Sequence, residues 1–366
     1  MVIGVLKEPS FETRVSLLPE TVAALVKKGI TVLVETGAGT KSFANDEAYT
    51  SAGAGISPSS QDVVSRSEVL LSIHPPEHIN DQLTTPKVLI GVYQPLFNRE
   101  LMQQYAEKGI TVFSLDMLPR TTRAQTMDVL SSQANIAGYK AVLLAAARYP
   151  RYFPMFMTAA GTTPPAKVLV LGAGVAGLQA IATARRLGAV VEVFDTRPAV
   201  KEEVMSLGAK FIEVEGAADA SSAGGYAVEQ SAEFLERQKQ KISDSIAKAD
   251  IVITTAQIFG KKAPLLVTSE MINRMKHGSV IVDLAAVTGG NTELTRNNEE
   301  VNVNGVTIIG NSALPASMPS DASKLYGKNV QNFLALITGK DAGLNLNFDD
   351  DLVKGSAVTH GGQLLR

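Results

Sequence analysis

Three absences limit what this chain of 366 residues can be. It has no cysteine, which excludes disulfides, thiolate catalysis and cysteine-ligated metal and fits a reducing compartment. Its 34 basic residues nearly balance its 36 acidic residues, so net charge favours neither nucleic acid nor an anionic membrane surface as a direct partner. The longest uncharged apolar stretch, Val168 to Ala184, is too short and too rich in glycine to span a bilayer. We therefore expect no direct membrane span.

Other common signals are also missing. Val2–Leu6 runs into Lys7 and Glu8 in the manner of a first strand, so we expect no signal peptide. No repeat of solenoid length occurs. We predict no metal site, because Pro75-Pro76 prevents His74 and His78 from sharing a helical face and no further ligands are near in sequence. The remaining composition, 45% hydrophobic, is sufficient for two full cores.

Strand and helix patterns alternate along the chain, as in α/β proteins. Helical patterns at Pro19–Lys28 and Asn98–Lys108 separate buried strands in the amino-terminal third. The strands expected there are Val2–Leu6, Thr31–Glu35, Val69–Ile73, Val88–Val92 and Thr111–Leu115. A long helix is expected from Met127 to Arg148. Further strands are expected at Val168–Leu171, Ile251–Thr255, Val280–Leu284 and Val306–Ile309.

These patterns predict an α/β protein with two doubly wound Rossmann-like domains. A helix expected at Ser323–Thr338 should pack back on the first domain, which would make that domain discontinuous in sequence. We therefore assign residues 1–127 and 315–366 to the first domain and residues 128–314 to the second.

The strongest motif lies between Lys167 and Arg197. An apolar strand runs into Gly172-Ala-Gly174-Val-Ala-Gly177, which is followed by a helix and a second strand. In a dinucleotide-binding βαβ unit, Gly172 permits the tight turn, Gly174 lets the backbone approach a pyrophosphate, and Gly177 lets the helix pack on the strand. The N–H groups of the following helix, which starts at Val175, would face the phosphates.

Asp195 stands at the tip of the second strand of this unit. A carboxylate there can accept hydrogen bonds from the adenosine ribose hydroxyls and would repel a 2′-phosphate, so the motif favours NAD(H) over NADP(H). Arg197 can also accommodate a 2′-phosphate. We expect Asp195 to decide the preference, and Arg197 to stack beside the adenine or be solvated. Thr196 between them completes the predicted ribose-binding segment.

The residues from Gly216 to Gly225 are rich in glycine, alanine and serine and precede Tyr226. This composition predicts a loop. From the residues alone, a connector without function and a flap that carries Tyr226 over bound nucleotide are equally good interpretations.

Over nearly its whole length the chain resembles the superfamily of alanine dehydrogenases and proton-pumping nicotinamide nucleotide transhydrogenases. The resemblance is carried by Lys7-Glu8, Arg14-Val15, Pro19-Glu20, Val282-Asp283-Leu284-Ala285 and Gly289-Gly290-Asn291. These features fit both branches, which differ in the chemistry that each must perform.

An amino-acid dehydrogenase needs general acid–base groups, because it must deprotonate an amine and handle water at an imine carbon. In alanine dehydrogenases these groups are a lysine, a histidine and an aspartate. The matching positions in this chain are His74, Gln94 and Val287, so none of the three residue types is retained. We interpret His74, which precedes two prolines at a strand end, as structural. An alanine dehydrogenase-like oxidoreductase with a relocated base is therefore the weaker hypothesis. A catalytically silent NAD-binding sensor or scaffold is also weaker, because the loop at Arg120 is intact.

The segment from Pro119 to Ser132 resembles the Arg-Gln-Asp loop of transhydrogenase domain I. The resemblance implies four catalytic residues that also bind nucleotide: Arg120, Gln125, Asp128 and Ser131. Arg120, with its neighbours Thr121 and Thr122, would contact the nicotinamide nucleotide, and Gln125 would contact its ribose at the junction with the second nucleotide.

Asp128 and Ser131 would hold the carboxamide, which needs an acceptor for its NH₂ group and a donor for its oxygen. The alternative is an ordinary helix start, with Thr126 as the cap and Asp128 favouring the amino end, which explains the threonine and the aspartate. It does not explain Arg120 and Gln125. By the same resemblance, Gly225 and Tyr226 belong to a mobile loop over the nucleotide.

Gln257, in Thr254-Thr255-Ala256-Gln257, matches a residue at the nucleotide in the same superfamily. The resemblance as a whole implies a Re/Si-specific, proton-translocating NAD(P)⁺ transhydrogenase, in which hydride passes directly from NADH to NADP⁺. NAD(H) would bind to this chain and NADP(H) to a partner domain.

Since the chain has only one dinucleotide fingerprint and no membrane segment, the resemblance places the NADP(H)-binding domain and the membrane proton channel on other polypeptides or beyond its end. The chain would be active only with those components. It would form a homodimer and lie on the cytoplasmic side of the inner membrane, held there through partner subunits.

Overall fold

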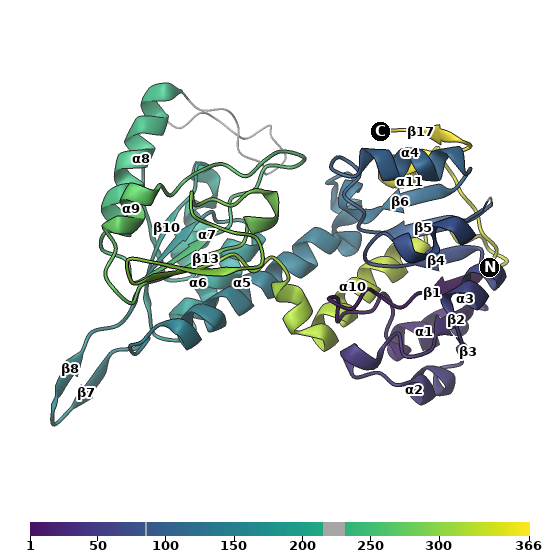
Figure 1. Ribbon diagram of the computed structural model, residues 1–366, viewed down its shortest axis with the longest axis horizontal. Helices are drawn as coiled ribbons and strands as arrows, with labels where there is room; N and C mark the ends of the chain where they lie inside the picture. The colour runs from purple at the N-terminus through teal and green to yellow at the C-terminus, as the bar shows by residue number, and fades with distance from the viewer. Residues whose placement is uncertain (85, 215–230) are drawn as a thin grey trace. The chain divides into compact units, whose positions relative to one another are not determined.

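A computed structural model describes residues 1–84, 86–214 and 231–366 (Figure 1). The chain forms two compact units. The first unit comprises Met1–Gln133 and Ala316–Arg366, and the second unit comprises Ala134–Pro315. Each is built on one mainly parallel sheet with helices packed on it, and the first is discontinuous in sequence. The predicted fold class is confirmed.

The sheet of the first unit has eight strands in the order β17-β16-β6-β5-β4-β1-β2-β3. The strands from β1 to β6 are parallel, whereas β16 runs antiparallel to β6 and β17 antiparallel to β16. Their bounds are β1 Val2–Val5, β2 Thr31–Glu35, β3 Gly55–Ser57, β4 Val69–Leu71, β5 Val88–Gly91, β6 Thr111–Ser114, β16 Ala357–His360 and β17 Gln363–Leu364. The chain returns from beyond the second unit to complete one edge of this sheet.

The α-helices of the first unit are α1 Pro19–Val26, α2 Asp46–Ser51, α3 Ser60–Arg66, α4 Arg99–Glu107, α10 Pro319–Leu334 and α11 Asp351–Ser356. The short 3₁₀ helices are η1 Thr40–Ser42, η2 Glu77–Gln82, η3 Leu115–Met117 and η4 Thr122–Met127, with η7 Leu314–Ser317 at the unit boundary. The helix α10 begins earlier than Ser323 because Pro319 suits the first helical turn. Its Tyr326, Val330 and Phe333 lie in the core that contains β1 and β2, as predicted.

The sheet of the second unit has seven strands in the order β11-β10-β9-β12-β13-β15-β14, and only β14 is antiparallel to its neighbour. The bounds are β9 Lys167–Leu171, β10 Val190–Phe194, β11 Lys210–Phe211, β12 Ile251–Thr254, β13 Val280–Asp283, β14 Glu300–Val303 and β15 Val306–Ile309. A separate hairpin, β7 Phe156–Thr158 and β8 Gly161–Thr163, extends away from this sheet (Figure 1).

Helices cover both faces of the second sheet. The strand β9 shows why: Val168 and Val170 lie in the core on one face, and Leu169 and Leu171 lie in the core on the other. The helices are α5 Val129–Arg148, α6 Val175–Arg186, α7 Lys201–Ser206, α8 Ala232–Ile246 and α9 Ser269–Asn273, with η5 Pro198–Val200 and η6 Ala286–Thr288. The long helix α5 starts in the first unit and continues into the second.

Among the residues that the structure describes, no helix has both the length and the apolar character required to cross a membrane.

Candidate nucleotide-binding site

The turn from β9 into α6 requires glycine at two of its three motif positions. Gly172 has a φ of +106°, and a Cβ on it would lie 2.5 Å from the Oγ1 atom of Thr255. A Cβ on Gly177 would lie 1.9 Å from the carbonyl oxygen of Gly172. The tight turn and the close helix packing predicted for these glycines are therefore present.

Gly174 differs from the other two. It has a φ of −76°, and among the described residues no atom beyond its chain neighbours lies within 4 Å of the position that a Cβ would take. The described residues thus leave open the space beside Gly174. Gly174 is the N-cap of α6 and provides no side-chain cap for the helix that starts at Val175. An open space before an N-terminus without a side-chain cap fits a pyrophosphate, which is attracted by the N–H groups and the helix dipole. The nucleotide contacts of Gly174 and Val175 stay predictions.

Asp195 lies beside this turn and is almost fully surrounded. Its Oδ2 atom accepts from the N–H of Ala173 at 2.7 Å and from Nη2 of Arg197 at 2.8 Å. Its Oδ1 atom accepts from the N–H of Arg197 at 2.8 Å and from Nε of the same residue at 2.9 Å. The side chains of Asp195 and Arg197 are 6% and 19% exposed. Thr196, between them, is half-buried.

The expectation that Arg197 is solvated is wrong. Its guanidinium forms a forked ion pair with Asp195 because the two residues follow the same strand end. This hydrogen bond raises the pKa of Arg197 above its usual range. Stacking of Arg197 beside the adenine stays a prediction. In the sequence, the only sign of this ion pair was the Asp-Thr-Arg spacing, which does not specify the partner of the Arg197 guanidinium.

The loop that carries Gln257 is held by residues that sequence reasoning connected only to the family pattern. The side chain of Asn291 donates to the carbonyl oxygens of Ala256 and Pro264, both at 2.8 Å, and accepts from the N–H of Ala256 at 3.0 Å. The fully buried Asp283 accepts from the N–H of Asn291 at 2.7 Å. Gln257 itself is exposed and donates to the carbonyl oxygen of Leu284 at 3.0 Å. Asn291 therefore fixes the backbone immediately before Gln257.

The predicted Arg-Gln-Asp loop contains η4 in the first unit. Of its predicted binding residues, Arg120, Thr121, Thr122 and Gln125 are exposed. The carbonyl oxygen of Thr126 accepts from the Nδ2 atoms of Asn329 and Asn332 on α10, at 2.8 and 2.9 Å. Arg123 forms a forked ion pair with Asp350, at 2.8 and 2.6 Å. Contacts from the C-terminal segment of the first unit thus brace this loop while Arg120 and Gln125 remain exposed.

Asp128 caps α5. The Oδ1 atom of Asp128 accepts from the N–H of Ser131 at 2.9 Å, and its Oδ2 atom accepts from the hydroxyl of Ser131 at 2.6 Å. Since α5 starts at Val129, Asp128 is the residue that stands at the cap. The alternative of an ordinary helix start with Thr126 as the cap does not fit, because η4 extends through Met127 and α5 starts only after it. The carboxamide contacts of Asp128 and Ser131 stay predictions.

A cluster of ionisable groups surrounds His74 in the first unit. The Nε2 atom of His74 lies 2.7 Å from Oε2 of Glu12, which also pairs with Arg14 at 2.7 Å. The backbone N–H groups of Ile73 and His74 donate to the carboxyl of Glu8, at 2.6 and 3.2 Å. Burial raises the pKa of Glu8 to about 7, whereas hydrogen bonds from Arg14 and His74 overcome burial and hold the pKa of Glu12 well below its usual range.

This ion-paired arrangement supports the structural interpretation of His74. At the other two positions that differ from alanine dehydrogenases, Gln94 adopts a left-handed backbone with a φ of +47°, and Val287 is 49% exposed. Neither side chain can donate or accept a proton at neutral pH.

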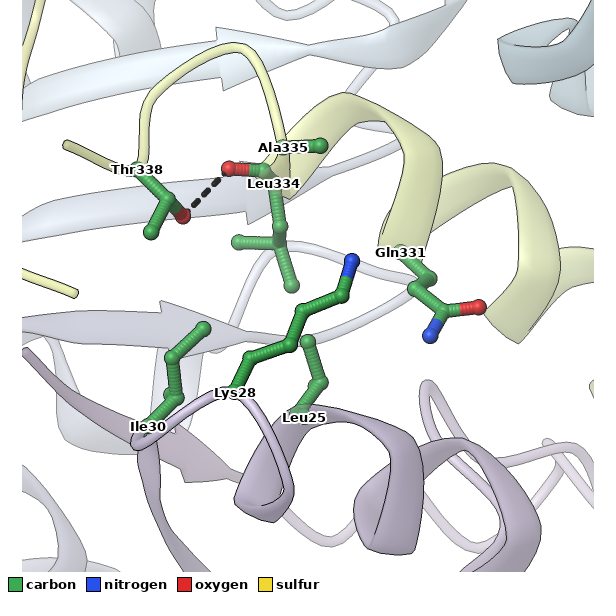
Figure 2. Close-up of a pocket in the computed structure, with 7 residues that line it drawn as sticks. All are labelled: Leu25, Lys28, Ile30, Gln331, Leu334, Ala335 and Thr338. Atoms are coloured by element: carbon green, nitrogen blue, oxygen red, sulfur yellow. Dashed lines mark hydrogen bonds between the residues drawn. The ribbon is translucent and has the colours of Figure 1, made fainter. Parts of the chain in front are cut away.

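Two cavities lie in the first unit. One of about 830 Å³ is lined by residues that include Lys7, Glu8, Phe11, Glu35 and His74. The other, of about 190 Å³, lies between α1 and α10 and is lined by Leu25, Lys28, Ile30, Gln331, Leu334, Ala335 and Thr338 (Figure 2). Among the described residues, none of those predicted to bind nucleotide lines either cavity.

Gly225 and Tyr226 lie outside the described residues. The other predicted residues form two groups, each within its own unit. Arg120, Thr121, Thr122, Gln125, Asp128 and Ser131 belong to the first unit, and Gly172, Gly174, Val175, Gly177, Asp195, Thr196, Arg197 and Gln257 belong to the second.

Two sheet-based units, one with a glycine turn, a helix N-terminus without a side-chain cap and an aspartate at the adjacent strand tip, define the class of Rossmann-type dinucleotide-binding proteins. Comparison with family models narrows this class. Residues 4–137 match the N-terminal domain of alanine dehydrogenase/PNT, and residues 141–366 match its C-terminal domain. The chain belongs to the alanine dehydrogenase/PNT family.

Relatives distinguish the two branches of that family. The chain is 44% identical over 368 residues to NAD(P) transhydrogenase subunit alpha of Haemophilus influenzae, covering 99% of this chain and 71% of the relative. It is 45% identical over 358 residues to NAD(P) transhydrogenase subunit alpha of Cereibacter sphaeroides, covering 96% and 68%. Alanine dehydrogenase of Bacillus subtilis is more distant, at 29% identity over 366 residues, 94% of this chain and 91% of the relative.

Comparison with solved structures also gives the higher similarity to a transhydrogenase. A transhydrogenase from Sinorhizobium meliloti superimposes with a TM-score of 0.91 at 45% identity, and the match covers 100% of both chains. An L-alanine dehydrogenase superimposes with a TM-score of 0.83 at 26% identity, covering 100% of this chain and 96% of the other. The chain is therefore a homologue of transhydrogenase subunit alpha.

Proposed function

We propose that this chain is the NAD(H)-binding component of a Re/Si-specific, proton-translocating transhydrogenase that reduces NADP⁺ bound on a partner domain. One observation carries the choice of branch: identity is 44% and 45% to two transhydrogenase subunits alpha and 29% to an alanine dehydrogenase, each over more than nine-tenths of the chain.

The residues of the second unit would bind the nucleotide. Gly174 and Val175 present backbone at the N-terminus of α6 for the pyrophosphate. Asp195 provides the carboxylate for the adenosine ribose, and Gln257 approaches from the adjacent loop. The dihydronicotinamide supplies the hydride, so the protein needs no acid–base group at the reacting carbon.

The residues of the first unit would orient the reacting end. Arg120 and Gln125 are exposed on a braced loop, and Asp128 with Ser131 offers an acceptor and a donor for a carboxamide. Their task is to hold one nicotinamide in alignment and to exclude water. Gly225 and Tyr226, which lie outside the described residues, would also contact the nucleotide.

We propose the domain division 1–127 with 315–366, and 128–314. The NADP(H)-binding domain and the membrane proton channel would be supplied by other polypeptides or segments, and the complex would lie on the cytoplasmic side of the inner membrane.

A homodimer is included in the proposal, and the hairpin β7–β8 supports it. Tyr152, Met155, Phe156 and Met157 on and before this hairpin are 60%, 59%, 44% and 75% exposed. Large apolar side chains gathered on a projecting ribbon are typical of a surface that another chain covers.

The test measures NADH-to-NADP⁺ hydride transfer with an NADP⁺ analogue, using this chain alone and with the NADP(H)-binding component. The chain alone should bind NADH and transfer almost no hydride, since one fingerprint holds one nucleotide. Addition of the component should restore transfer. Transfer that is absent in the reconstituted mixture, or alanine-dependent formation of NADH, would contradict the proposal.

A further inference from the structure

Every hydrogen-bonding direction of the Asp195 carboxylate is already occupied by this chain. A carboxylate has about four acceptor positions. Asp195 receives four donors: one from the N–H of Ala173 and three from Arg197. An adenosine ribose binds to a strand-tip aspartate by donating from its hydroxyls, so it finds no vacant acceptor in this arrangement.

The backbone donors belong to the two turns: Ala173 lies between Gly172 and Gly174, and Arg197 lies two residues after Asp195 in the turn that follows β10. The guanidinium of Arg197 is the only one of these partners on a side chain that can rotate away. Its two contacts, from Nε and Nη2, cover both oxygens.

We propose that Arg197 acts as a specificity-determining latch, whose guanidinium must release Asp195 before the adenosine ribose of NADH can bind. The inference rests on the proposed nucleotide site. In this role Arg197 competes with the adenosine ribose for Asp195, in place of stacking on the adenine or being solvated. The affinity for NADH is therefore lower than Asp195 alone would provide.

The released side chain needs a second acceptor, and the proposal assigns this role to Glu203 on α7. Glu203 is exposed, and its charge contributes to raising the pKa of Arg197, after the hydrogen bond and the charge of Asp195. The latch itself rests on the hydrogen bonds between Arg197 and Asp195.

The latch also changes selectivity between the two nucleotides. Asp195 rejects a 2′-phosphate by charge repulsion and by lack of donors. An arginine beside it neutralises the carboxylate and, once released, can pair with the phosphate itself. Removal of the guanidinium should thus strengthen NADH binding and weaken NADPH binding.

The decisive measurement is equilibrium binding of NADH and of NADPH, by nucleotide fluorescence, to the full chain and to Arg197→Met. Methionine keeps much of the apolar stem and removes the donors. We expect NADH to bind about threefold to tenfold more tightly, the equivalent of one displaced ion pair, and NADPH to bind more weakly. Arg274→Met is the matched control, because Arg274 pairs with Asp244 in the same unit and should leave both affinities unchanged.

A double-mutant cycle tests the second position of the side chain. Glu203→Gln removes the partner of the released guanidinium and should weaken NADH binding about twofold to fivefold. In the Arg197→Met background the same change should have no effect. Glu202→Gln, on the adjacent exposed residue of α7, is the control.

Arg197→Met should change the affinities for NADH and NADPH in opposite directions, which distinguishes the latch from a purely structural role of Arg197. If Arg197→Met weakens the binding of both nucleotides, Arg197 is a direct ligand or a support and the latch is overturned. If the Arg197→Met variant fails to fold, Arg197→Lys, which cannot form the forked ion pair, provides the same test. Equal NADH affinity in wild type and Arg197→Met also overturns it. Wild-type protein that binds no NADH would refute the nucleotide site itself, a result that is distinct from a missing difference between variants.

Discussion

At the residue scale, the immediate partners of three carboxylates give them different properties. Glu8 is 7% exposed, and burial raises its pKa to about 7. Glu12 is 3% exposed, but Arg14 and His74 keep its pKa low. Asp195 is shared between a backbone N–H and Arg197. Residue type alone does not distinguish these cases, because each depends on which donor lies within hydrogen-bond distance.

Protonation of Glu8 should contribute to the pH dependence of the free energy of unfolding. Its folded pKa of about 7 exceeds the ordinary 4.5, so the folded state binds its proton more strongly than the unfolded state does. The resulting stability is complete below pH 4.5 and is lost as pH rises to about 7, a change of up to about 3 kcal/mol. Glu8→Gln should flatten this decline in urea unfolding followed by circular dichroism. Glu77→Gln, exposed on the same cavity, should retain it. If the loss of stability with rising pH persists in Glu8→Gln, another group causes it.

Asp195→Asn should weaken NADH binding by about 1–2 kcal/mol, because the amide offers one acceptor oxygen where the carboxylate offers two. The penalty for NADPH should be smaller, since the charge that repels a 2′-phosphate is gone. Nucleotide fluorescence measures both affinities. Asp250→Asn is the control: Asp250 binds the N–H of Lys167 at the opposite end of β9 and should leave the nucleotide ratio unchanged. Unchanged affinities in Asp195→Asn would refute its assignment.

At the element scale, the β9–α6 turn combines a structural need and a predicted binding need in one glycine motif. Gly177 is required by contact with the backbone of Gly172, whereas nothing in the described chain fills the space beside Gly174. The two glycines are therefore open to different tests.

Gly174→Ala should fold with a loss of at most about 1 kcal/mol, since its φ of −76° suits alanine and only the cap preference changes. It should nevertheless lose much of its NADH affinity, because the methyl group enters the space assigned to the pyrophosphate. Gly177→Ala should instead lose about 3 kcal/mol or more of stability, since its Cβ would meet a carbonyl oxygen at 1.9 Å. Thermal unfolding beside NADH titration checks both. A Gly174→Ala protein with full NADH affinity would remove Gly174 from the site.

The loop η4 shows a similar division between bracing and exposed residues. Asn329 and Asn332 hold the carbonyl of Thr126, while Gln125 is exposed. Gln125→Asn should retain NADH affinity but slow hydride transfer in the reconstituted complex, because a shorter side chain disturbs alignment more than it removes binding energy. Single-turnover transfer beside NADH titration separates these effects. Lower affinity with an intact transfer rate would make Gln125 a binding residue only.

At the scale of the whole molecule, the two units separate the predicted tasks: the second holds the glycine turn and Asp195, and the first holds the braced loop and the His74 cluster. A protein that orients nucleotides for direct hydride transfer needs no proton donor at the reacting carbon.

The purified chain should therefore not oxidise alanine. His74, Gln94 and Val287 occupy the positions of the required lysine, histidine and aspartate, and the loss of an acid–base group typically costs on the order of 10²–10⁴ in rate. Formation of NADH from NAD⁺ with and without alanine is the measurement. Activity that depends on alanine and remains after purification to homogeneity would show that a base has been relocated.

The amino-acid sequence by itself determined the buried parallel strands that it predicted, the helices α1, α4, α5, α6 and α10, and the glycine turn, because hydrophobic periodicity and turn chemistry act over a few neighbouring residues. It did not indicate the antiparallel edge strands β14, β16 and β17. Val168–Leu171, Gly172 and Gly177 have the roles that their spacing predicts. The return of α10 to the first core also followed from its apolar pattern.

Only the tertiary structure decided which partner each polar side chain takes. Asn291 donates to Ala256 and Asn332 donates to Thr126 across long sequence separations. Arg197 pairs with Asp195 instead of being solvated. Burial of Glu8 likewise depends on the strands packed around it. Such choices are set by distances of a few ångströms between elements, which periodicity does not encode, and they place the charges on which the predicted chemistry depends.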